Sequence, residues 1–280
     1  MNLHGNTILI TGGGSGIGLA LAEEFAKIGN EVIVAARSTE KLRVAKNKGL
    51  QTIRADVSDA ASIRALAERA REEFPRLNVV IHNAAVCRRE EFVHGNNATA
   101  REETIATNLL GPMRLTDALL PRLLEQKEAV VMVVTSGLAF VPSAFFPTYS
   151  ATKAALHSYT QSLRFQLRNT PVKVIEIVPP YVQTQLGGPQ QASDPNAMPL
   201  GTFVAEVMEI LREGPYVEEV LVSQVHRHRY ATEKGRKDYA TFFRQYNEAR
   251  ESRPARRLAD PSRREPVEPR LASDGGRRTP

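Results

Sequence analysis

The chain has 280 residues, of which 42% are hydrophobic, and this is enough for one substantial core. Its single cysteine, Cys87, excludes an intramolecular disulfide, no apolar run approaches the roughly 20 residues that cross a bilayer, and no secretory signal is expected. These features predict a cytoplasmic protein without a membrane partner. The net charge of +6 lies in the C-terminal region, where residues 226–280 carry 15 Lys and Arg against 8 Asp and Glu. The body of the chain is therefore not basic, and no nucleic-acid partner is expected.

Short β-branched runs alternate with longer amphipathic segments, which is the pattern of βαβ units. Strands are expected at residues 7–11, 31–36, 51–54, 78–82, 129–136, 172–178 and 219–223. Helices are expected at residues 17–28, 40–48, 60–74, 101–126, 149–168 and 202–212. Ser38 and Asp59 are candidate N-caps, and Gly29 and Gly49 can end helices in the left-handed conformation. This order predicts an α/β fold with a single doubly wound domain, in which helices cover both faces of a seven-stranded parallel sheet.

The amino-acid composition of the C-terminal third changes twice along the chain. Residues 183–201 are rich in Gly and Pro and predict a long substrate loop, the last part of a domain that spans residues 1–225. Residues 226–250 are expected to form a helical extension, and residues 251–280 a disordered basic tail. The alternating basic residues 226–229 are interpreted as a solvated edge. An aromatic stripe of the extension is interpreted as a packing surface; it consists of Tyr239, Phe242, Phe243 and Tyr246.

A glycine-rich turn follows the first expected strand and precedes a helix. Glycines permit the tight turn and let backbone N–H groups approach a pyrophosphate at the positive end of the helix. Strand, turn and helix together favour a dinucleotide-binding Rossmann fold over a glycine-rich loop without a ligand. The residues expected to contact the dinucleotide are Gly12, Gly14, Ser15, Gly16, Ile17 and Gly18.

The end of the second strand indicates which dinucleotide is bound. An acidic residue commonly holds the ribose hydroxyls of NAD at this point, but here the chain has Arg37 and Ser38. A guanidinium can pair with a 2′-phosphate in a bidentate manner, so we favour NADP(H) over NAD(H). The alternative is that Arg37 is a solvated loop residue.

Tyr149 and Lys153 are four residues apart, and Ser136 lies 13 residues before the tyrosine. On a helix, residues i and i+4 share a face, so the ammonium of Lys153 would lie beside the phenol of Tyr149 and lower its pKa. Such a phenol can exchange a proton with a carbonyl or alcohol oxygen. Taken alone, such a pair is more often incidental on a surface helix, and only its context favours an active site.

With the glycine turn and this trio, residues 3–225 resemble the short-chain dehydrogenase/reductases, and in particular their bacterial DltE-type members. The resemblance implies that Asn108, Ser136, Tyr149 and Lys153 are catalytic, with Asn108 supporting a water beside the lysine. It also implies further cofactor contacts, including Tyr149 and Lys153 themselves. The others are Asp56 and Val57 at the adenine, Asn83, Ala84 and Ala85 after the fourth strand, and Pro179, Val182 and Thr184 after the sixth.

The resemblance implies an oxidoreductase that transfers a hydride between the nicotinamide and the carbonyl or secondary alcohol of a small substrate, and Arg37 makes NADP the expected cofactor. No metal is expected, and the family suggests a homodimer or homotetramer. A largely apolar substrate pocket is expected from Leu138, Phe140, Phe145, Phe146, Tyr181 and Leu186. Two alternatives stay open: a non-catalytic cofactor-binding sensor or scaffold, and an epimerase or dehydratase that uses the same site.

Overall fold

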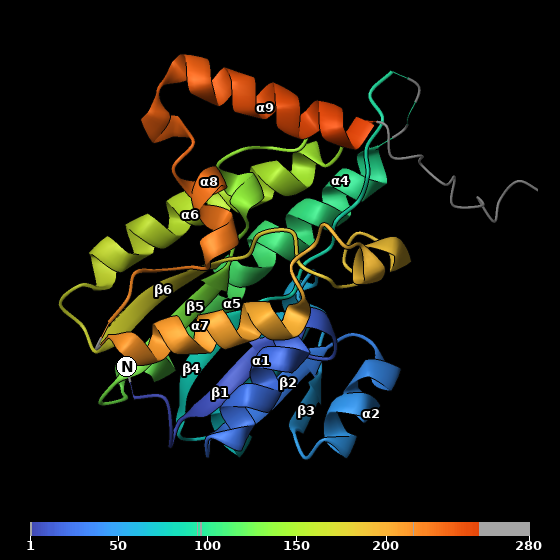
Figure 1. The fold of residues 1–280 in the computed structure, drawn as a ribbon. Coiled ribbons are helices and arrows are strands. Elements are labelled where there is room, and N and C mark those ends of the chain that lie inside the picture. Colours follow the sequence, from blue (N-terminus) through green and yellow to red (C-terminus); the bar gives the residue numbers. More distant parts are fainter. Residues whose placement is uncertain (1, 94, 96, 215, 252–280) are drawn as a thin grey trace, which may run out of the picture.

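The computed structural model of the chain describes residues 2–93, 95, 97–214 and 216–251. Seven strands form one parallel sheet with the order β3-β2-β1-β4-β5-β6-β7 (Figure 1). They are β1 (Thr7–Thr11), β2 (Glu31–Ala36), β3 (Gln51–Arg54), β4 (Leu77–His82), β5 (Ala129–Val134), β6 (Val172–Val178) and β7 (Glu219–Leu221). The predicted doubly wound, seven-stranded sheet is confirmed.

The helices connect these strands and cover both faces of the sheet (Figure 1). They are α1 (Gly16–Lys27), α2 (Thr39–Asn47), α3 (Ala60–Glu73), α4 (Ala98–Ile105), α5 (Gly111–Leu124), α6 (Pro147–Leu167), α7 (Leu200–Glu213), α8 (His226–Arg229) and α9 (Arg236–Glu251). The four residues predicted to cap or end helices are confirmed. The side chains of Ser38 and Asp59 accept N-cap hydrogen bonds, and Gly29 and Gly49 have positive φ angles directly after α1 and α2.

Alternating side chains of the strands build two separate cores. In β1, Ile8 and Ile10 belong to the core beneath α1 and α7, whereas Leu9 belongs to the core beneath α3, α5 and α6. All three side chains are fully buried, as expected for a parallel strand that is covered on both faces. The sheet is therefore a rigid base, and its connecting loops are free to carry the chemistry.

The long helix predicted at residues 101–126 is broken into three parts. α4 ends at Ile105, a π-helical turn spans Ala106–Leu110, and α5 begins at Gly111. Pro112 has no N–H group to donate to the carbonyl of Asn108 four residues earlier, so the regular α-helical hydrogen bond cannot form there. The interruption consequently falls at the predicted catalytic asparagine.

The C-terminal extension folds back over the body of the domain. α9 crosses the molecule close to α6 and α4 (Figure 1), where Asn247 Oδ1 accepts a hydrogen bond from Ala144 N at 2.7 Å and Asn247 Nδ2 donates one to the Pro142 carbonyl at 3.2 Å. The predicted disordered tail lies outside the described residues except for residue 251. Across the described part of the chain, no helix has the length and apolarity needed to span a bilayer.

Candidate active site

A cleft of 930 Å³ runs across the carboxyl ends of the strands, from the turn after β1 to the start of α6 and the C-terminal extension. The strand order reverses direction between β1 and β4, and open α/β sheets bind their ligands at such a switch point. The cleft is thus placed by topology, and the residues lining it come from loops far apart in the sequence.

The glycine turn and the loop after β4 are packed directly on one another. Gly12 has a φ of +66°, and a Cβ atom there would lie 2.7 Å from the backbone Cα of Ala84. A Cβ at Gly18 would collide with the side-chain amide of Asn83. These two positions leave no room for a larger residue, which is the requirement of a close backbone cradle for a pyrophosphate.

The Asn83 side chain holds the two loops together. Its Nδ2 donates to the Thr11 carbonyl at 3.0 Å and to the Gly12 carbonyl at 3.3 Å, while Thr11 Oγ1 accepts from the backbone N of Asn83 at 3.1 Å and of Ala84 at 3.2 Å. Asn83, Ala84 and Ala85 all line the cleft. The arrangement fixes the glycine turn against the loop after β4.

The far end of the cleft, beside β2 and β3, is basic. Arg37 lies 3.7 Å from Asp56 and 3.7 Å from Glu103 and keeps 51% of its side chain exposed, so it is loosely held. Ser38 lines the cleft and caps α2. Lys41 also lines it, and the Cβ of Lys41 lies 2.7 Å from where a Cβ of Gly14 would stand. Lys41 escaped the sequence analysis, although its position in the first turn of α2, four residues after Arg37, could have revealed it.

The adenine-side residues Asp56 and Val57 line the cleft between this basic end and the glycine turn. The Asp56 carboxylate accepts hydrogen bonds from Ser58 N at 2.9 Å and Ser58 Oγ at 2.7 Å, which hold the loop after β3 in place. The carboxylate is therefore oriented by its own loop, and its other oxygen faces Arg37 across the cleft.

Ser136, Tyr149 and Lys153 meet at the inner end of the cleft, and each is at least 93% buried. Ser136 follows β5, while Tyr149 and Lys153 lie one turn apart on α6, so they share a face as predicted. The Lys153 ammonium lies 5.6 Å from the centroid of the Tyr149 ring and donates to the Val134 carbonyl at 2.7 Å. The strand end thus fixes the lysine beside the tyrosine.

Burial is the main influence on the pKa values of Tyr149 and Lys153. It raises the pKa of Tyr149, against the lowering effect of a side-chain hydrogen bond with Ser136. It lowers the pKa of Lys153 to about 8, with the charge of Glu176 acting in the opposite direction. The expected depression of the Tyr149 pKa is therefore absent, because desolvation of the phenolate outweighs the neighbouring ammonium.

Asn108 is completely buried in the π-helical turn, and its side chain is fully engaged. Its Oδ1 accepts from Val86 N at 2.8 Å, and its Nδ2 donates to the Val86 carbonyl at 2.8 Å and to Thr152 Oγ1 at 3.4 Å. These bonds join the loop after β4 to α6, directly beside Lys153. Of the four predicted catalytic residues, Asn108 alone is not among those lining the cleft.

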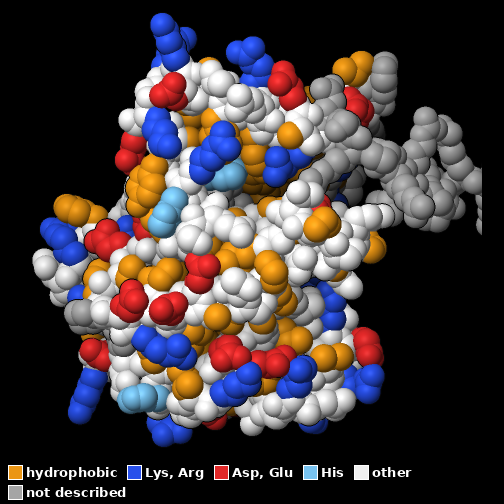
Figure 2. Space-filling model, in the orientation of Figure 1, with side chains coloured by type: hydrophobic (Ala, Val, Ile, Leu, Met, Phe, Trp, Pro, Cys, Tyr) orange, Lys and Arg blue, Asp and Glu red, His pale blue; other side chains and the backbone are white. Residues whose placement is uncertain are grey.

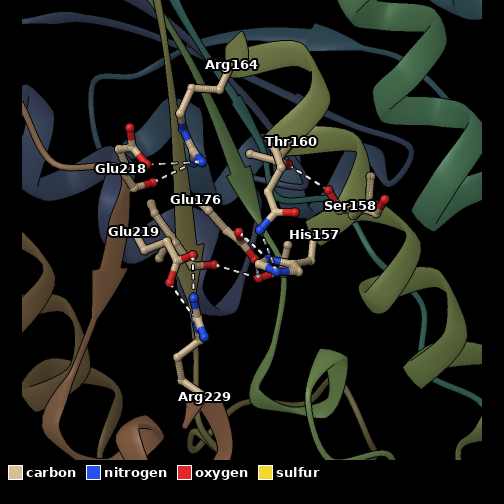
Figure 3. A network of polar contacts seen from close by, with 12 residues as sticks. His157, Ser158, Thr160, Arg164, Glu176, Glu218, Glu219 and Arg229 are labelled. Carbon is tan, nitrogen blue, oxygen red and sulfur yellow. Dashed lines mark hydrogen bonds and ion pairs between the residues drawn. The ribbon is translucent and has the colours of Figure 1, made fainter. Parts of the chain in front are cut away.

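Behind the trio, a buried polar network extends to the edge of the sheet (Figure 3). The Glu176 carboxylate on β6 is fully buried; it accepts from Thr135 Oγ1 at 2.6 Å and lies 2.8 Å from His157 Nδ1. Arg229 of α8 pairs with Glu219 of β7 at 2.6 Å on the outer side of this network (Figure 3). A carboxylate therefore lies behind the strand that carries Ser136, where sequence analysis identified no functional residue.

The stretch after β6 forms the wall of the cleft that faces the glycine turn. Pro179, Val182 and Thr184 line the cleft, and a Cβ at Gly16 would stand 3.5 Å from the Thr184 side chain. Val182 pairs with Met198 in an isolated parallel bridge, which closes the loop onto the start of α7. The loop thereby faces the glycine turn across the cleft.

The match to known proteins agrees with this geometry. A protein-family model described as short chain dehydrogenase matches residues 6–195. The chain belongs to the short-chain dehydrogenase family. This confirms the resemblance seen in the sequence, and it makes the protein an oxidoreductase by membership.

Relatives and solved structures of this family extend over most of the chain. The uncharacterized oxidoreductase DltE of Bacillus subtilis is 40% identical over 255 residues, covering 88% of this chain and 98% of the relative. The NADP-dependent 3-hydroxy acid dehydrogenase of Schizosaccharomyces pombe is 31% identical, covering 80% and 95%. A short-chain dehydrogenase from Sphingobium yanoikuyae in complex with NADPH superimposes with a TM-score of 0.70 at 26% identity, covering 84% and 95%. The 3-ketoacyl-(acyl-carrier-protein) reductase from Brucella melitensis, complexed with NADH, has a TM-score of 0.69 at 26% identity and covers 76% and 93%.

Five of the six residues predicted for the substrate pocket of this short-chain dehydrogenase line the cleft. They are Leu138, Phe145, Phe146, Tyr181 and Leu186. Phe140 is the exception: its ring packs edge-on against His157 at 4.7 Å and beneath the Arg229 guanidinium at 5.0 Å, outside the cleft lining. The prediction for Phe140 was wrong because the short helical turn Gly137–Ala139 directs the following residue toward α8 and β7.

The C-terminal extension of this short-chain dehydrogenase contributes lining residues that sequence analysis assigned elsewhere. His228, Tyr246 and Arg250 face the cleft, and the His228 ring lies 5.0 Å from Tyr246 and 5.1 Å from Phe242. The interpretation of residues 226–229 as a solvated edge is therefore wrong for His228, whose pKa is lowered to about 4 mainly by burial. The aromatic stripe on α9 was the available signal, since its packing partner could have been the site itself.

Cys87 also lines the cleft, close to the trio. Burial raises its pKa to about 12, so the thiol stays protonated at neutral pH. Its position gives it no nucleophilic role, and it forms part of the pocket wall.

Proposed function

We propose that this protein is an NADP-preferring oxidoreductase that interconverts a carbonyl group and a secondary alcohol on a small, largely apolar substrate. The observation that supports this most directly is the convergence of Ser136, Tyr149 and Lys153 at the inner end of a cleft that begins at a glycine cradle. The cradle can hold a pyrophosphate, and the trio offers hydrogen-bond and proton-transfer groups to one substrate oxygen.

The nicotinamide dinucleotide, when bound, supplies or accepts the hydride. The protein's own residues position the substrate and exchange a proton with its oxygen. Tyr149 Oη exchanges a proton with the substrate oxygen, as an acid in reduction and as a base in oxidation. Ser136 Oγ donates to the same oxygen and stabilises negative charge there. Lys153 favours the phenolate electrostatically once it turns from the Val134 carbonyl toward the cleft.

Asn108 supports the trio indirectly. Because its side-chain amide is engaged by Val86 and Thr152, a water beside Lys153 would have to be held by the main-chain carbonyl of Asn108, which Pro112 leaves without its α-helical donor. The role proposed for Asn108 is therefore to hold, through its main-chain carbonyl, a water that exchanges protons with Lys153.

NADP preference rests on the basic end of the cleft. Arg37, Ser38 and Lys41 lie together there, and a 2′-phosphate could accept hydrogen bonds from all three. The Schizosaccharomyces pombe relative is an NADP-dependent enzyme that acts on a hydroxyl-bearing substrate, which supports both the cofactor and the reaction type.

The experiment is to incubate the purified protein with NADPH or NADH and a panel of aromatic and aliphatic ketones, aldehydes and secondary alcohols, following the absorbance of the reduced cofactor. We expect turnover of at least one ketone or aldehyde, with NADPH preferred. Cofactor binding without turnover of any compound would favour the sensor or scaffold. Conversion of an alcohol without net change of cofactor absorbance would favour an epimerase or dehydratase.

We further propose a cytoplasmic homodimer or homotetramer that assembles through α5 and α6. The exposed surface of these helices retains large apolar side chains, with Phe165 65% exposed and Leu124 41% exposed. Light scattering at several concentrations tests the assembly, and a monomer at all of them would contradict it.

A further inference from the structure

The part of the cleft beside Tyr149 carries positive charge that forms no ion pair with a carboxylate of the described residues. Arg89 comes from the loop after β4 and Arg250 from the end of α9, and both line the cleft near Tyr149. The neighbouring Arg88 pairs with Glu103 at 3.2 Å, but neither Arg89 nor Arg250 forms an ion pair with any residue that the structure describes. Asp56, at the opposite end, is the only acidic residue among the described residues that line the cleft.

Both guanidinium groups are held over aromatic rings of the pocket. Arg89 lies 4.2 Å from the centroid of Phe145, and Arg250 lies 3.6 Å from the centroid of Tyr246. Stacking fixes the plane of a guanidinium. Arg250 Nη1 also donates to the Tyr246 carbonyl at 2.9 Å, and the remaining N–H groups can face a planar anion. Figure 2 shows basic side chains beside a recessed apolar area at the level of α9.

The C-terminal extension brings one of these charges into the chamber. Asn247 anchors α9 to the loop at residues 142–144, directly before Phe145 and Phe146. His228, Tyr246, Arg250 and Tyr149 all line this one cleft, and burial together with the positive charge of Arg250 lowers the pKa of His228. The catalytic tyrosine and Arg250 therefore belong to one continuous chamber.

We propose that the substrate is an oxo acid, or the corresponding hydroxy acid, whose carboxylate is bound by Arg89 and Arg250 while its carbonyl faces Ser136 and Tyr149. This inference rests on the proposed function and deepens it. An apolar body of the substrate lies against Phe145, Phe146 and Tyr246, and the two arginines hold its charged end at the mouth. Like the dinucleotide at the other end, the substrate is then an anion in a cleft of positive potential.

The test compares methyl ketones that carry a terminal carboxylate, in a series of chain lengths and including 4-acetylbenzoate, with their methyl esters. The carboxylate is expected to raise kcat/KM roughly 10- to 100-fold over the ester, in line with hydrogen bonds to a charged group. Arg89→Gln and Arg250→Gln should each raise the KM of the carboxylate substrates and so reduce the preference for the acid over its ester. Arg168→Gln is the matched control, because Arg168 stacks on Phe165 at 4.0 Å outside the cleft lining and should change nothing.

Calorimetric binding of the same compounds to the full chain with NADP⁺ separates this inference from the proposed function. Esters and acids turned over equally, with no effect of either arginine, would overturn the oxo-acid assignment and leave the oxidoreductase intact. Carboxylates that bind through Arg89 and Arg250 without turnover would support the assignment and contradict the reaction. If no carboxylate in the series binds more tightly than its ester, the assignment is wrong.

Discussion

His157 Nδ1 lies 2.8 Å from the Glu176 carboxylate, one turn of α6 beyond Lys153 (Figure 3). The other Glu176 oxygen accepts from Thr135, the residue before Ser136. A fully buried carboxylate is thus linked to both elements that carry the proposed catalytic trio. The charge of Glu176 therefore acts on Lys153 and raises its pKa.

Glu176→Gln should move the alkaline limb of the activity profile to lower pH. The Glu176 charge raises the pKa of Lys153 against the dominant effect of burial, which brings it to about 8. Removing that charge lets Lys153 lose its proton at a lower pH, and kcat/KM, which reports the free enzyme, should fall earlier. The profile is measured with NADPH and a turned-over ketone. Glu219→Gln is the control, since Glu219 pairs with Arg229, and an identical shift in both variants would argue against a specific effect on Lys153.

Tyr149→Phe should remove turnover while cofactor binding persists. The phenol is the proposed proton donor, and loss of a positioned acid or base typically lowers rates by about 10²–10⁴-fold. The cofactor cradle uses backbone atoms elsewhere, so the NADPH dissociation constant should change little. Single-turnover kinetics and fluorescence titration measure the two quantities. Tyr159→Phe on the same helix, outside the cleft lining, should retain activity; comparable rates in both variants would contradict the role of Tyr149.

Arg37→Ala and Lys41→Ala should each weaken NADPH binding about 10-fold or more and leave NADH binding nearly unchanged, because each removes a charged hydrogen bond to a 2′-phosphate. Titration of both cofactors against both variants provides the measurement. Arg43→Ala is the control, since Arg43 lies on the same helix but pairs with Glu40 at 2.8 Å. Equal losses for the two cofactors would remove the basis for NADP preference.

Gly12→Ala should destabilise the protein and weaken dinucleotide binding, whereas Gly201→Ala should not. At Gly12 the φ of +66° and the Ala84 backbone both oppose a Cβ, and a cost of about 1–3 kcal/mol is expected. At Gly201, in the first turn of α7, a Cβ would meet nothing within 4 Å, so alanine should stabilise by about 0.5–1 kcal/mol. Urea unfolding gives both values. Similar changes at the two sites would contradict the packing of the cradle.

The free energy of unfolding should fall as pH drops from 6.5 to 4, in part through His82. Burial lowers the pKa of His82 from 6.5 to about 4, so in this window the unfolded chain takes up a proton that the folded protein excludes. The stabilisation is therefore complete above pH 6.5 and decreases on acidification, by on the order of 3 kcal/mol. Urea unfolding at several pH values measures it. His82→Gln should show a weaker pH dependence, and an unchanged slope would assign the effect to other groups such as His228.

The local sequence was sufficient to predict features that depend only on residues close to one another along the chain. Alternation of apolar segments predicted all seven strands, and residues such as Ser38, Asp59, Gly29 and Gly49 marked helix ends through their own backbone chemistry. Tyr149 and Lys153 were paired correctly because helical geometry alone places them on one face.

Predictions that depended on packing were less successful. The break at Asn108 could have been anticipated from Pro112, and the packing of α9 on the site from its aromatic stripe, but the direction of Phe140 could not. The Phe140 ring is oriented by His157 and Arg229, which only the folded chain brings to it. The same holds for Glu176, which is buried where β6, α6 and the segment after β5 meet.

By itself, the sequence determined the doubly wound sheet, the glycine cradle and the Ser136, Tyr149 and Lys153 trio, because each follows from short-range periodicity or steric need. The tertiary structure alone decided how that trio is protonated and which residues enclose the substrate. Desolvation depends on the atoms that surround a group in space, so only the folded chain shows that the Tyr149 pKa is raised. Likewise, Arg89 and Arg250 lie far apart in the sequence and become parts of one chamber only when α9 is anchored over it.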